Sequence, residues 1–390
     1  MSKLLIVGAS ILQLPAIHQA KEMGLQVAVA DYNPQAVGIP YADKYYNAST
    51  IDTDAICRVA EDFKPDGIMT LATDMPMRPI AAATTKLGLP GISMDTALKS
   101  TDKGAMAKAF KDHNVASPWY YLVSVEDDLD HLAPNLTFPC IMKPTDNAGS
   151  RGVALVSSME ELRTNYSYSR QQSRGGNVII EEYLQGSEVS VEVMVVDGKV
   201  HILAITDKLT TGAPHFVEMG HSQPAILSIS VQKQIVELAE NAVKAVGINC
   251  GPAHVEMKIT ERGPVMIELG ARMGGDCITT HLVPLSTGID MIKATIDVAL
   301  GLKPDITPKF HKGSAIRYFD VPRGVIKSIE GIEDARKKEG VKDIVFTKSV
   351  GDIVTDIQSS IDRVGFVIAQ GETAQEAVDI CKTSIVIKTE

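Results

Sequence analysis

The chain lacks an uninterrupted apolar run long enough to cross a membrane, so we expect no membrane-spanning segment. A span needs roughly 18–20 apolar residues, and the most apolar stretch, residues 289–302, is interrupted by three charged side chains. An excess of basic residues is missing as well, since 38 Lys and Arg face 48 Asp and Glu, a net charge of −10. Nothing in this balance offsets phosphate repulsion, so we expect no nucleic-acid partner, although a local basic pocket stays compatible with it.

Cysteines are few, and their spacing predicts neither disulfides nor a metal site. The five thiols are scattered, odd in number and never arranged as Cys-x-x-Cys. This pattern favours reduced thiols and a cytoplasmic protein. Cys277 lies near the candidate site described below, and we interpret it as a small buried packing residue.

Repeats and low-complexity tracts are also absent, and the remaining pattern is that of an α/β protein with α+β parts. A chain of 390 residues is too long for one hydrophobic core and predicts two or three domains. Strand and helix patterns alternate over residues 1–95, which predicts a parallel sheet whose first strand is not a secretory signal. The polar stretch 167–177, with two glycines, predicts a mobile connector. Beyond residue 305 the pattern predicts short strands and one helix at 373–384.

The turn after the first strand resembles a dinucleotide-binding motif only in part. Gly8 follows that strand and Asp31 ends the next one, the places that a nicotinamide-binding fold uses. The second and third glycines of the fingerprint are missing, because the chain continues Ala-Ser-Ile-Leu-Gln. The pattern therefore favours a tight turn on an ordinary parallel sheet over a dehydrogenase.

Residues 251–260 and 264–270 form a predicted pair of strands. The three residues Glu-Arg-Gly between them make a short hairpin loop, whose glycine can adopt the left-handed conformation. A loop of this length is expected to pair Thr260 with Pro264. The register then carries Glu256 directly opposite Glu268.

The two opposed glutamates are the most informative feature of the chain. Alternation puts both carboxylates on one face of the sheet and Val255, Met257, Ile267 and Leu269 on the other. Like charges opposite one another repel, so a cation is expected between them, and hard oxygen ligands favour Mg²⁺ that bridges the phosphates of a nucleoside triphosphate. Side chains pointing into water are the alternative. Arg272 and paired glycines follow at once, and the guanidinium fork suits phosphate or carboxylate oxygens.

A second cluster surrounds Lys143, at the end of an apolar strand where a lysine is costly to bury without an anion. The loop 147–152 that follows is rich in small residues, including Ser150 and Gly152, whose amides can cradle phosphate oxygens. The lysine precedes the glycines, so this is not a Walker-type loop. A plain hairpin turn is the alternative.

A third cluster of carboxylates follows another apolar strand at residues 178–184. Alternation sends Glu181 to one face and Glu182 with Leu184 to the other, and Glu188 comes shortly after. Such a run is able to accept the amino group of adenine and the hydroxyls of ribose. A solvated strand end is the alternative.

Taken in order, these elements resemble the ATP-grasp superfamily over nearly the whole chain, most closely its carboxylate–amine ligases and their relatives. These include the L-amino acid ligases, the purine-pathway synthetases, biotin carboxylase and carbamoyl-phosphate synthetase. The residues that carry the resemblance are Lys103, Lys143, the loop 149–152, Glu181 to Leu184, Glu188, Glu256, Glu268 and Arg272. The tail at 362–377 looks like the last domain of the purine enzymes. No single motif is specific, but their order and spacing are.

The resemblance implies roles for these residues. ATP phosphates would be held by Lys103, Lys143 and the closing loop with Ser150 and Gly152. Adenine would be bound by Glu181 and the backbone of Glu182 and Leu184, ribose by Glu188, and Mg²⁺ (or Mn²⁺ in its place) by Glu256 and Glu268. Arg272 would grip the substrate carboxylate or an acyl phosphate. Glu218 and His221, in a segment similar to the amino-acid ligase branch, would meet an amine.

One departure from the family pattern concerns the metal site. Relatives commonly have asparagine two residues beyond the second metal glutamate, and Gly270 stands there in this chain. A second metal ion would then bind more weakly or take a ligand from elsewhere, for which Asp276 is a candidate.

The resemblance also implies a domain division and an activity. We expect an N-terminal α/β domain at 1–98, an ATP-grasp domain at 99–304 with a mobile lid at about 115–185, and a C-terminal domain at 305–390. The expected reaction is ATP-dependent joining of a small carboxylate to an amine, with a homodimer as the expected assembly. An ATP-dependent carboxylase, a carbamoyl-phosphate-type enzyme and a catalytically silent ATP-binding protein are the alternatives.

Overall fold

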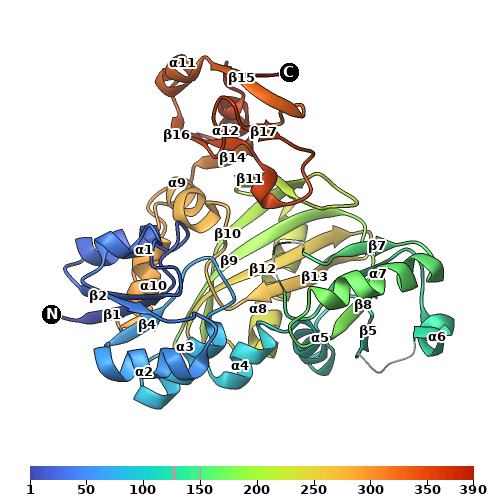
Figure 1. Ribbon diagram of the computed structural model, residues 1–390, viewed down its shortest axis with the longest axis horizontal. Coiled ribbons are helices and arrows are strands. Elements are labelled where there is room, and N and C mark those ends of the chain that lie inside the picture. The colour runs from blue at the N-terminus through green and yellow to red at the C-terminus, as the bar shows by residue number, and fades with distance from the viewer. Residues whose placement is uncertain (125–128, 148, 150) are drawn as a thin grey trace.

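The computed structural model describes residues 1–124, 129–147, 149 and 151–390. Its N-terminal part is a parallel sheet in the order β3-β2-β1-β4, which confirms the strand–helix alternation seen in the sequence (Figure 1). The elements of this part are β1 (Lys3–Val7), α1 (Leu14–Glu22), β2 (Gln26–Asp31), η1 (Ile39–Tyr41), β3 (Lys44–Asn47), α2 (Thr53–Phe63), β4 (Gly67–Met69), α3 (Met77–Leu87), α4 (Met94–Lys99) and α5 (Lys103–Asp112).

The turn after β1 is the tight turn that the sequence favours. Gly8 has a φ of +103°, a conformation that residues with a Cβ rarely adopt. The backbone N–H of Ala9 donates to the carboxylate of Asp31 at 2.8 Å. Asp31 is therefore engaged in holding two strand ends together.

A large antiparallel sheet forms the centre of the molecule, in the order β13-β12-β9-β10-β11-β14-β18-β16 (Figure 1). One helix, α8 (Ile229–Val246), buries its apolar side against it, because Ile235, Ala239 and Val243 share one core with the valines of β9. The first five strands are β9 (Ser187–Val196), β10 (Lys199–Thr210), β11 (Glu218–Gln223), β12 (Gly251–Thr260) and β13 (Gly263–Gly270).

A smaller antiparallel sheet, β5-β8-β6-β7, lies beside the central one and carries the predicted lid. It packs against α7 through a core of its own that includes Met142, Leu162 and Ile180. The expected connector at 167–177 is wrong over its first half, because α7 extends to Gln171, from an N-cap at Ser158 whose hydroxyl accepts from the N–H of Glu161. The elements are β5 (Tyr120–Val123), α6 (Leu129–Leu132), η2 (Ala133–Asn135), β6 (Cys140–Pro144), β7 (Ala154–Val156), α7 (Met159–Gln171) and β8 (Val178–Glu182).

The C-terminal strands continue the central sheet. β14 pairs with β11 and β18, and β16 forms the edge, while β15, β17 and β19 form a separate small sheet. The helix expected at 373–384 is α12, and the sequence analysis missed α11. The elements are η3 (Ile278–Leu282), α9 (Val283–Thr287), α10 (Met291–Ala299), β14 (Gly313–Tyr318), β15 (Gly324–Glu330), α11 (Ile332–Lys337), β16 (Val341–Phe346), β17 (Ile353–Val354), η4 (Ser360–Asp362), β18 (Gly365–Gly371), α12 (Ala374–Cys381) and β19 (Val386–Thr389).

Segments far apart in the chain share these layers. α10 packs on α1 and β4, and its Ile296 lies in one core with Leu4 and Ile17 of the N-terminal part. The central sheet crosses residue 305, where a domain boundary is expected. The division at residues 98 and 304 stays a prediction.

The β12–β13 hairpin has the expected pairing of Glu256 with Glu268 but a different pairing near its loop. Thr260 pairs with Gly263, so the expected pairing of Thr260 with Pro264 is wrong. A bulge then leaves Ile267 unpaired, and Glu256 still lies opposite Glu268. The bulge also turns Ile267 toward the candidate site instead of the core, in contrast to the expected alternation.

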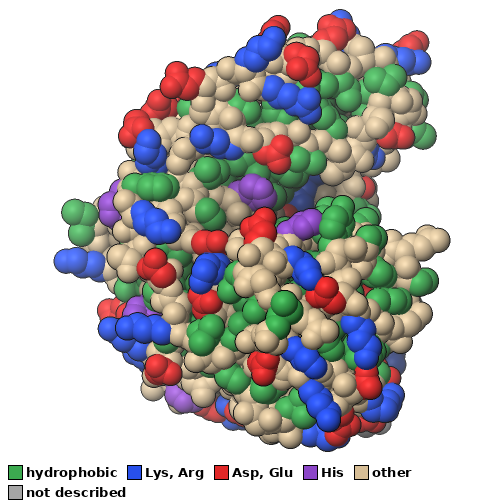
Figure 2. Space-filling model, turned by 90° about the vertical axis from the view of Figure 1, so that its left-hand side faces the viewer, with side chains coloured by type: hydrophobic (Ala, Val, Ile, Leu, Met, Phe, Trp, Pro, Cys, Tyr) green, Lys and Arg blue, Asp and Glu red, His purple; other side chains and the backbone are tan. Residues whose placement is uncertain are grey.

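Charge is distributed evenly over the face shown in Figure 2. Acidic and basic side chains are interspersed there, so the net negative charge is not concentrated on that face. Among the residues that the structure describes, no helix has the length and apolar character that crossing a membrane requires.

The packing of α8 predicts a contrast between two isoleucines of the same helix. Ile235 is fully buried, whereas Ile229 is 73% exposed. We expect Ile235→Ala to lower the free energy of unfolding by about 2–5 kcal/mol, because it leaves a cavity under the central sheet. Ile229→Ala should change it by less than about 0.5 kcal/mol. Urea denaturation of both variants measures this, and equal losses would contradict the packing.

Candidate active site

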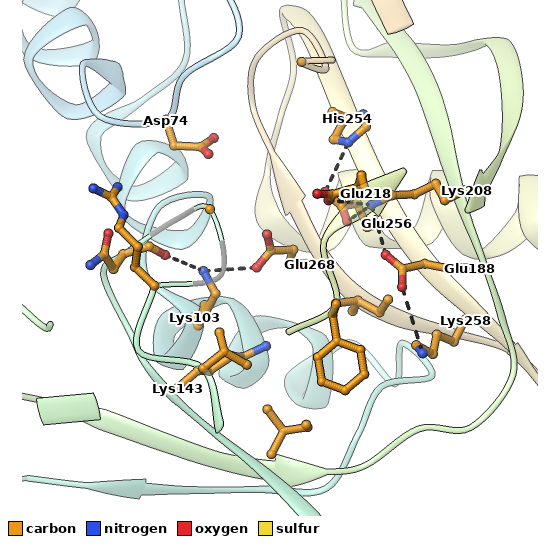
Figure 3. Close-up of a pocket in the computed structure, with 18 of the residues that line it drawn as sticks. Asp74, Lys103, Lys143, Glu188, Lys208, Glu218, His254, Glu256, Lys258 and Glu268 are labelled. Atoms are coloured by element: carbon orange, nitrogen blue, oxygen red, sulfur yellow. Dashed lines mark hydrogen bonds and ion pairs between the residues drawn. The ribbon is translucent and has the colours of Figure 1, made fainter. Parts of the chain in front are cut away.

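The predicted site residues converge on one cavity of about 370 Å³, between the central sheet, the lid sheet and the turn after β4. Figure 3 shows how ten of the lining residues lie. The predicted residues that line the cavity are Lys103, Lys143, Glu181, Glu182, Leu184, Glu188, Glu218, His221, Glu256, Glu268 and Arg272. Gly152 is not among the lining residues, and Ser150 lies outside the described residues.

Strand register explains why so many charged side chains point the same way. Lys258 of β12, Glu188 of β9, Lys208 of β10 and His221 of β11 are successive partners in one row across the sheet. Cross-strand partners project from the same face. That row and the Glu256–Glu268 pair therefore present their polar groups to the cavity, while α8 covers the opposite face.

Lys208 is the cation at the centre of this arrangement. Its side chain is only 2% exposed, and its Nζ lies 2.6 Å from Glu256, 3.0 Å from Glu188 and 3.6 Å from Glu218. Burial opposes the charged form, but these three carboxylates outweigh it and raise the pKa of Lys208 well above its usual range. The ammonium in turn stabilises the ionised form of Glu256. Burial opposes this at Glu256 too, yet Lys208 and His254 hold the pKa of its carboxyl well below the usual value.

His254 joins Glu256 to a carboxylate deeper in the sheet. Its Nδ1 lies 2.8 Å from Glu192 and its Nε2 lies 3.1 Å from Glu256. Burial alone would lower the pKa of the imidazole, but Glu192 and Glu256 raise it to about 9, so both ring nitrogens donate at neutral pH. Because Glu192 is fully buried in β9, His254 fixes the position of the Glu256 carboxylate.

Glu268 has a cation of its own on the other side of the pair. Lys103, at the start of α5, places its Nζ 3.0 Å from Glu268 and also donates to the carbonyl of Asn147 at 2.9 Å. Burial would raise the pKa of Glu268, but Lys103 lowers it. The two glutamates are thus flanked by different cations on opposite sides, as Figure 3 shows.

The pair fits a divalent cation that takes its remaining ligands from a phosphate. Glu256 and Glu268 face each other across the strands and offer hard oxygen donors, and no third candidate ligand among the described residues completes a protein-only cluster. Mg²⁺ is commonly held by one or two carboxylates together with substrate phosphates and water. This donor set suits such a site.

Lys143 and Glu181 form a buried ion pair on the lid. The Nζ of Lys143 lies 2.6 Å from Glu181, and both residues are less than 10% exposed. They come from neighbouring strands β6 and β8. The apolar side chains of Ile141, Val153 and Leu184 line the same part of the cavity. A flat aromatic base therefore finds apolar walls beside a carboxylate acceptor there.

Glu182 and Gly152 have packing roles in the structure. Glu182 accepts from the guanidinium of Arg262, at the tip of the β12–β13 hairpin, at 2.6 Å, which ties the lid sheet to the central sheet. Gly152 has a φ of +78°, and a Cβ there would lie 2.8 Å from Gln172 and 3.0 Å from Pro144. Glycine is therefore needed at position 152, beside Gln172 at the end of α7.

Arg272 is held by a bidentate ion pair with Asp74, in the turn after β4. Its Nε and Nη2 each donate to the carboxylate at 2.9 Å. A guanidinium has five N–H groups, so others stay available to an anion. Gly270 makes this pair fit, because a Cβ at 270 would lie 2.5 Å from Asp74 Oδ1. Asp74 thus occupies the space that the side chain of an asparagine at position 270 would need.

A further group of side chains closes the cavity at the C-terminal end. Asp276 pairs with Arg363 at 2.7 Å, and Arg363 stacks on Tyr318 with its Cζ 3.8 Å from the ring centroid. Although burial opposes it, hydrogen bonds from His221 and Arg363 lower the pKa of Asp276. Both oxygens of Asp276 are engaged by Arg363. Its expected role as an additional metal ligand stays a prediction.

His221 and Glu218 lie beside this group. His221 is 1% exposed and lines the cavity, and its Nδ1 has no hydrogen-bond partner among the described residues. Burial raises the pKa of Glu218, in spite of the nearby Lys208. A buried polar atom without a partner is costly, and a ligand that donates to it or accepts from it removes that cost.

The cysteines take no part in this chemistry. All five are free. Burial raises the pKa of the Cys277 thiol to about 12, which leaves it protonated at neutral pH and supports the packing role expected for it.

Several residues of the site were missed by the sequence analysis. Lys208, His254, Asp74 and Arg363 contact predicted site residues, and Glu192 contacts His254. His254 was detectable, because it lies two residues before Glu256 and so faces the same side of the strand. Glu192 was detectable as a lone charge in an apolar strand. Asp74 and Arg363 carry no local signal.

Comparison with known proteins agrees with the fold. Residues 136–280 match the family model of the ATP-grasp domain, and residues 317–385 match the L-amino acid ligase C-terminal domain 2. The alanine–anticapsin ligase of Bacillus subtilis (strain 168) is 30% identical over 268 residues, 63% of this chain and 56% of that protein. An L-arginine-specific L-amino acid ligase of Bacillus subtilis is 25% identical over 308 residues, 76% of this chain and 73% of that protein.

Solved structures show the same architecture. The crystal structure of an L-amino acid ligase from Bacillus licheniformis has a TM-score of 0.85 at 22% identity and covers 100% of this chain and 99% of its own. Phosphoribosylglycinamide synthetase from Anaerococcus prevotii has a TM-score of 0.79 at 24% identity, with 100% of both chains covered. In contrast, the chain spans only a little more than half the length of the alanine–anticapsin ligase.

The fold agrees with the ATP-grasp domain that residues 136–280 match. The matched C-terminal domain and the two ligases of Bacillus subtilis make the chain similar to carboxylate–amine ligases, which form C–N bonds.

His254 predicts a pH-dependent stability in the metal-free protein. Its pKa of about 9 in the folded state lies above the usual 6.5. The stabilisation by the imidazolium is therefore complete below pH 6.5 and is lost as the pH rises through 9. We expect urea denaturation with a chelator present to show a free energy of unfolding that falls by at most about 1.4 kcal/mol per pH unit over this range.

Two variants test whether the imidazole of His254 causes this pH dependence of the free energy of unfolding. His254→Gln should remove this part of the pH slope, whereas His201→Gln, which changes a partly exposed imidazole of β10, should keep it. Identical slopes for the two variants would show that another group is responsible.

Proposed function

We propose that the protein binds ATP with Mg²⁺, activates a small-molecule carboxylate as an acyl phosphate, and joins it to an amine with release of ADP and phosphate. The observation that carries this proposal is the Glu256–Glu268 pair in one cavity with four cations, Lys103, Lys143, Lys208 and Arg272. No simple hydrophobic ligand requires such a concentration of buried charge.

The nucleotide would lie across the lid and the central sheet. Adenine enters the apolar slot beside Glu181, where its amino group reaches the carboxylate and the backbone of Glu182 and Leu184. Glu188 accepts from the ribose hydroxyls, and Lys103 and Lys143 bind phosphate oxygens. Glu256 and Glu268 would hold Mg²⁺, with Mn²⁺ as a substitute, and the bound ion would supply positive charge that neutralises the phosphates during γ-phosphoryl transfer.

The reaction consists of two transfers: the γ-phosphoryl group passes to the carboxylate, and the acyl group then passes to the amine with release of phosphate. A carboxylate oxygen attacks the γ-phosphorus, the bond to the bridging oxygen breaks, and ADP departs. This removes the delocalised charge that makes a carboxylate a poor electrophile. The protein contributes alignment and fixed positive charge from Arg272 and the lysines, and the lid keeps water from hydrolysing the acyl phosphate.

The carboxylate substrate would lie near Arg272, with Glu218 and His221 at its amino group. His221, whose Nδ1 has no hydrogen-bond partner in the part of the chain that the structure describes, and Glu218 both line this end of the cavity. The similarity to an alanine–anticapsin ligase and an L-arginine-specific L-amino acid ligase supports an amino acid as this substrate.

The L-amino acid ligase C-terminal domain favours this reaction over a carboxylase or a carbamoyl-phosphate synthetase. The test is to measure ADP and phosphate release over pairs of amino acids and small acids, with and without bicarbonate. Release that depends on bicarbonate alone would favour those alternatives, and the absence of release with every pair would favour a silent ATP-binding protein. A homodimer and a cytoplasmic location stay predictions, which light scattering and cell fractionation test.

Loss of one metal glutamate should abolish turnover without unfolding the protein. We expect Glu268→Ala to lower kcat by about 100-fold or more, because charge neutralisation by the bound metal contributes several kcal/mol. The thermal midpoint should stay within a few degrees of the unmodified protein. Glu237→Ala, on the exposed side of α8, is the matched control. Full ATP-dependent ligation by Glu268→Ala would exclude the metal role.

Removal of the lid lysine should weaken nucleotide binding. Lys143→Met should raise the Kd for ADP by about 10- to 100-fold, the contribution of a charged hydrogen bond. Calorimetric titration with MgADP measures this, with the exposed Lys111→Met of α5 as control. An unchanged titration would count against the assignment of Lys143.

A further inference from the structure

A buried carboxylate lies behind the metal pair and has no part in the proposed reaction. Glu192 is fully buried in β9, on the face of the strand that it shares with Ser190. Its Oε1 accepts from the hydroxyl of Ser190 at 3.1 Å, and its Oε2 has no hydrogen-bond partner among the described residues. Burying a carboxylate with one oxygen unpaired is costly, so its presence in the middle of an apolar strand calls for a physical reason.

Strand register joins Glu192 to the metal pair through one imidazole. His254 of β12 lies directly opposite Glu192, and Glu256 lies opposite Ser190. The ring of His254 is thereby placed between two carboxylates, with Nδ1 2.8 Å from Glu192 and Nε2 3.1 Å from Glu256. Figure 3 shows the bond to Glu256. Carboxylates only accept hydrogen bonds, so both ring nitrogens donate, and a turn of the ring would break both bonds.

The loop after β13 covers this pair from the other side. A Cβ at Gly274 would lie 2.6 Å from His254 Nδ1 and 2.9 Å from Glu192 Oε2. The carbonyl of Gly274 accepts from the hydroxyl of Thr279 at 2.7 Å, and Thr279 and Met273 are both fully buried. The backbone of an anchored loop therefore packs directly on the imidazole, which leaves the ring little room to move.

The two oxygens of Glu256 are consequently unequal. His254 donates to Oε1 and has no other position in which it keeps both of its bonds. Lys208 contacts Oε2 at 2.6 Å, but it has two further carboxylate partners, Glu188 at 3.0 Å and Glu218 at 3.6 Å. A cation that approaches Oε1 meets a fixed imidazolium, whereas one that approaches Oε2 displaces an ammonium that keeps two partners. The arrangement favours Oε2 alone as a metal ligand.

We propose that Glu192 and His254 are positioning residues that restrict Glu256 to one metal-binding oxygen and thereby select Mg²⁺ or Mn²⁺ over Ca²⁺. The inference rests on the proposed function, because it needs a metal ion at the glutamate pair. Mg²⁺ demands near-ideal octahedral geometry at about 2.0–2.1 Å, which a carboxylate held in place supplies. Ca²⁺ takes about six to eight oxygens at longer distances, and a carboxylate that cannot turn denies it the second oxygen.

Calorimetric titration with ADP measures this selectivity without turnover. Each protein is titrated with ADP in the presence of Mg²⁺, Mn²⁺, Ca²⁺ or a chelator. For the unmodified protein we expect the Kd for ADP to be lowest with Mg²⁺ or Mn²⁺, higher with Ca²⁺ and highest with the chelator. The titration with the chelator reports the nucleotide pocket and the fold independently of the metal.

Loss of the buried carboxylate should weaken binding of the small ions in particular. For Glu192→Gln we expect the Kd with Mg²⁺ and with Mn²⁺ to rise about 10- to 100-fold, the range for removal of a group that supports a metal ligand. The Kd with Ca²⁺ should change less, because Glu256 is then able to turn and offer both oxygens. The Kd with the chelator should stay unchanged. Gly274→Ala, which displaces the imidazole, should change the values in the same direction.

Two controls separate selectivity from stability. Glu237→Gln makes the same chemical change on the exposed side of α8, and Val193→Ala leaves a cavity next to Glu192 on the opposite face of β9. Both should keep the ratio of the Kd with Ca²⁺ to the Kd with Mg²⁺, although Val193→Ala should lower the thermal midpoint. A variant that does not fold loses ADP binding with the chelator as well, and the other of Glu192→Gln and Gly274→Ala then carries the test.

Each outcome decides between the two proposals. A fall in the ratio of the Kd with Ca²⁺ to the Kd with Mg²⁺, confined to Glu192→Gln and Gly274→Ala, supports the selection of the ion by these positioning residues. An unchanged ratio, the same fall in Val193→Ala, or no preference for Mg²⁺ in the unmodified protein would overturn it. Equal binding of ADP with Mg²⁺ and with the chelator would instead overturn the metal site of the proposed function, and absence of ADP binding would overturn its nucleotide site.

Discussion

The site depends on keeping two carboxylates ionised at close range inside the protein. Glu256 and Glu268 face each other across β12 and β13, a placement that Coulomb repulsion and burial both oppose. The negative charge of Glu256 is compensated by Lys208 and His254, and that of Glu268 is compensated by Lys103. Lys208 and His254 come from two strands of the central sheet and Lys103 comes from α5, so the sheet and this helix must be assembled before the carboxylates are stable as anions.

The sequence was sufficient for those parts of the fold that follow from periodicity. Alternation of strand and helix predicted the parallel sheet, and alternation within strands placed Glu256 and Glu268 on one face. The bulge at Ile267 shows where such reasoning ends. Loop length alone predicted the wrong pairing for Thr260, and a one-residue irregularity restored the glutamate pair. An irregularity of that kind depends on packing against neighbouring strands, which no local pattern records.

The candidate site was predictable where a residue's own strand fixes its direction, and not where its partner lies far along the chain. Asp74 and Arg272 are 198 residues apart, and Arg363 and Asp276 are 87 apart. These ion pairs join the N-terminal and C-terminal parts to the cavity. Before folding, nothing distinguishes Asp74 from other acidic residues in loops. The resemblance to ATP-grasp proteins supplied the set of candidate residues, and the structure supplied the groups that hold them in place.

Gly270 and Asp74 occupy what is in effect one volume. The carboxylate of Asp74 fills the space that the Cβ of any other residue at 270 would take. A hydrogen bond from Arg272 holds this carboxylate in position. Positions 74 and 270 are therefore not independent choices in a redesign of the candidate metal site. An asparagine grafted onto the hairpin is compatible with the present backbone only if the aspartate is shortened at the same time, and Arg272 then needs a new counterion.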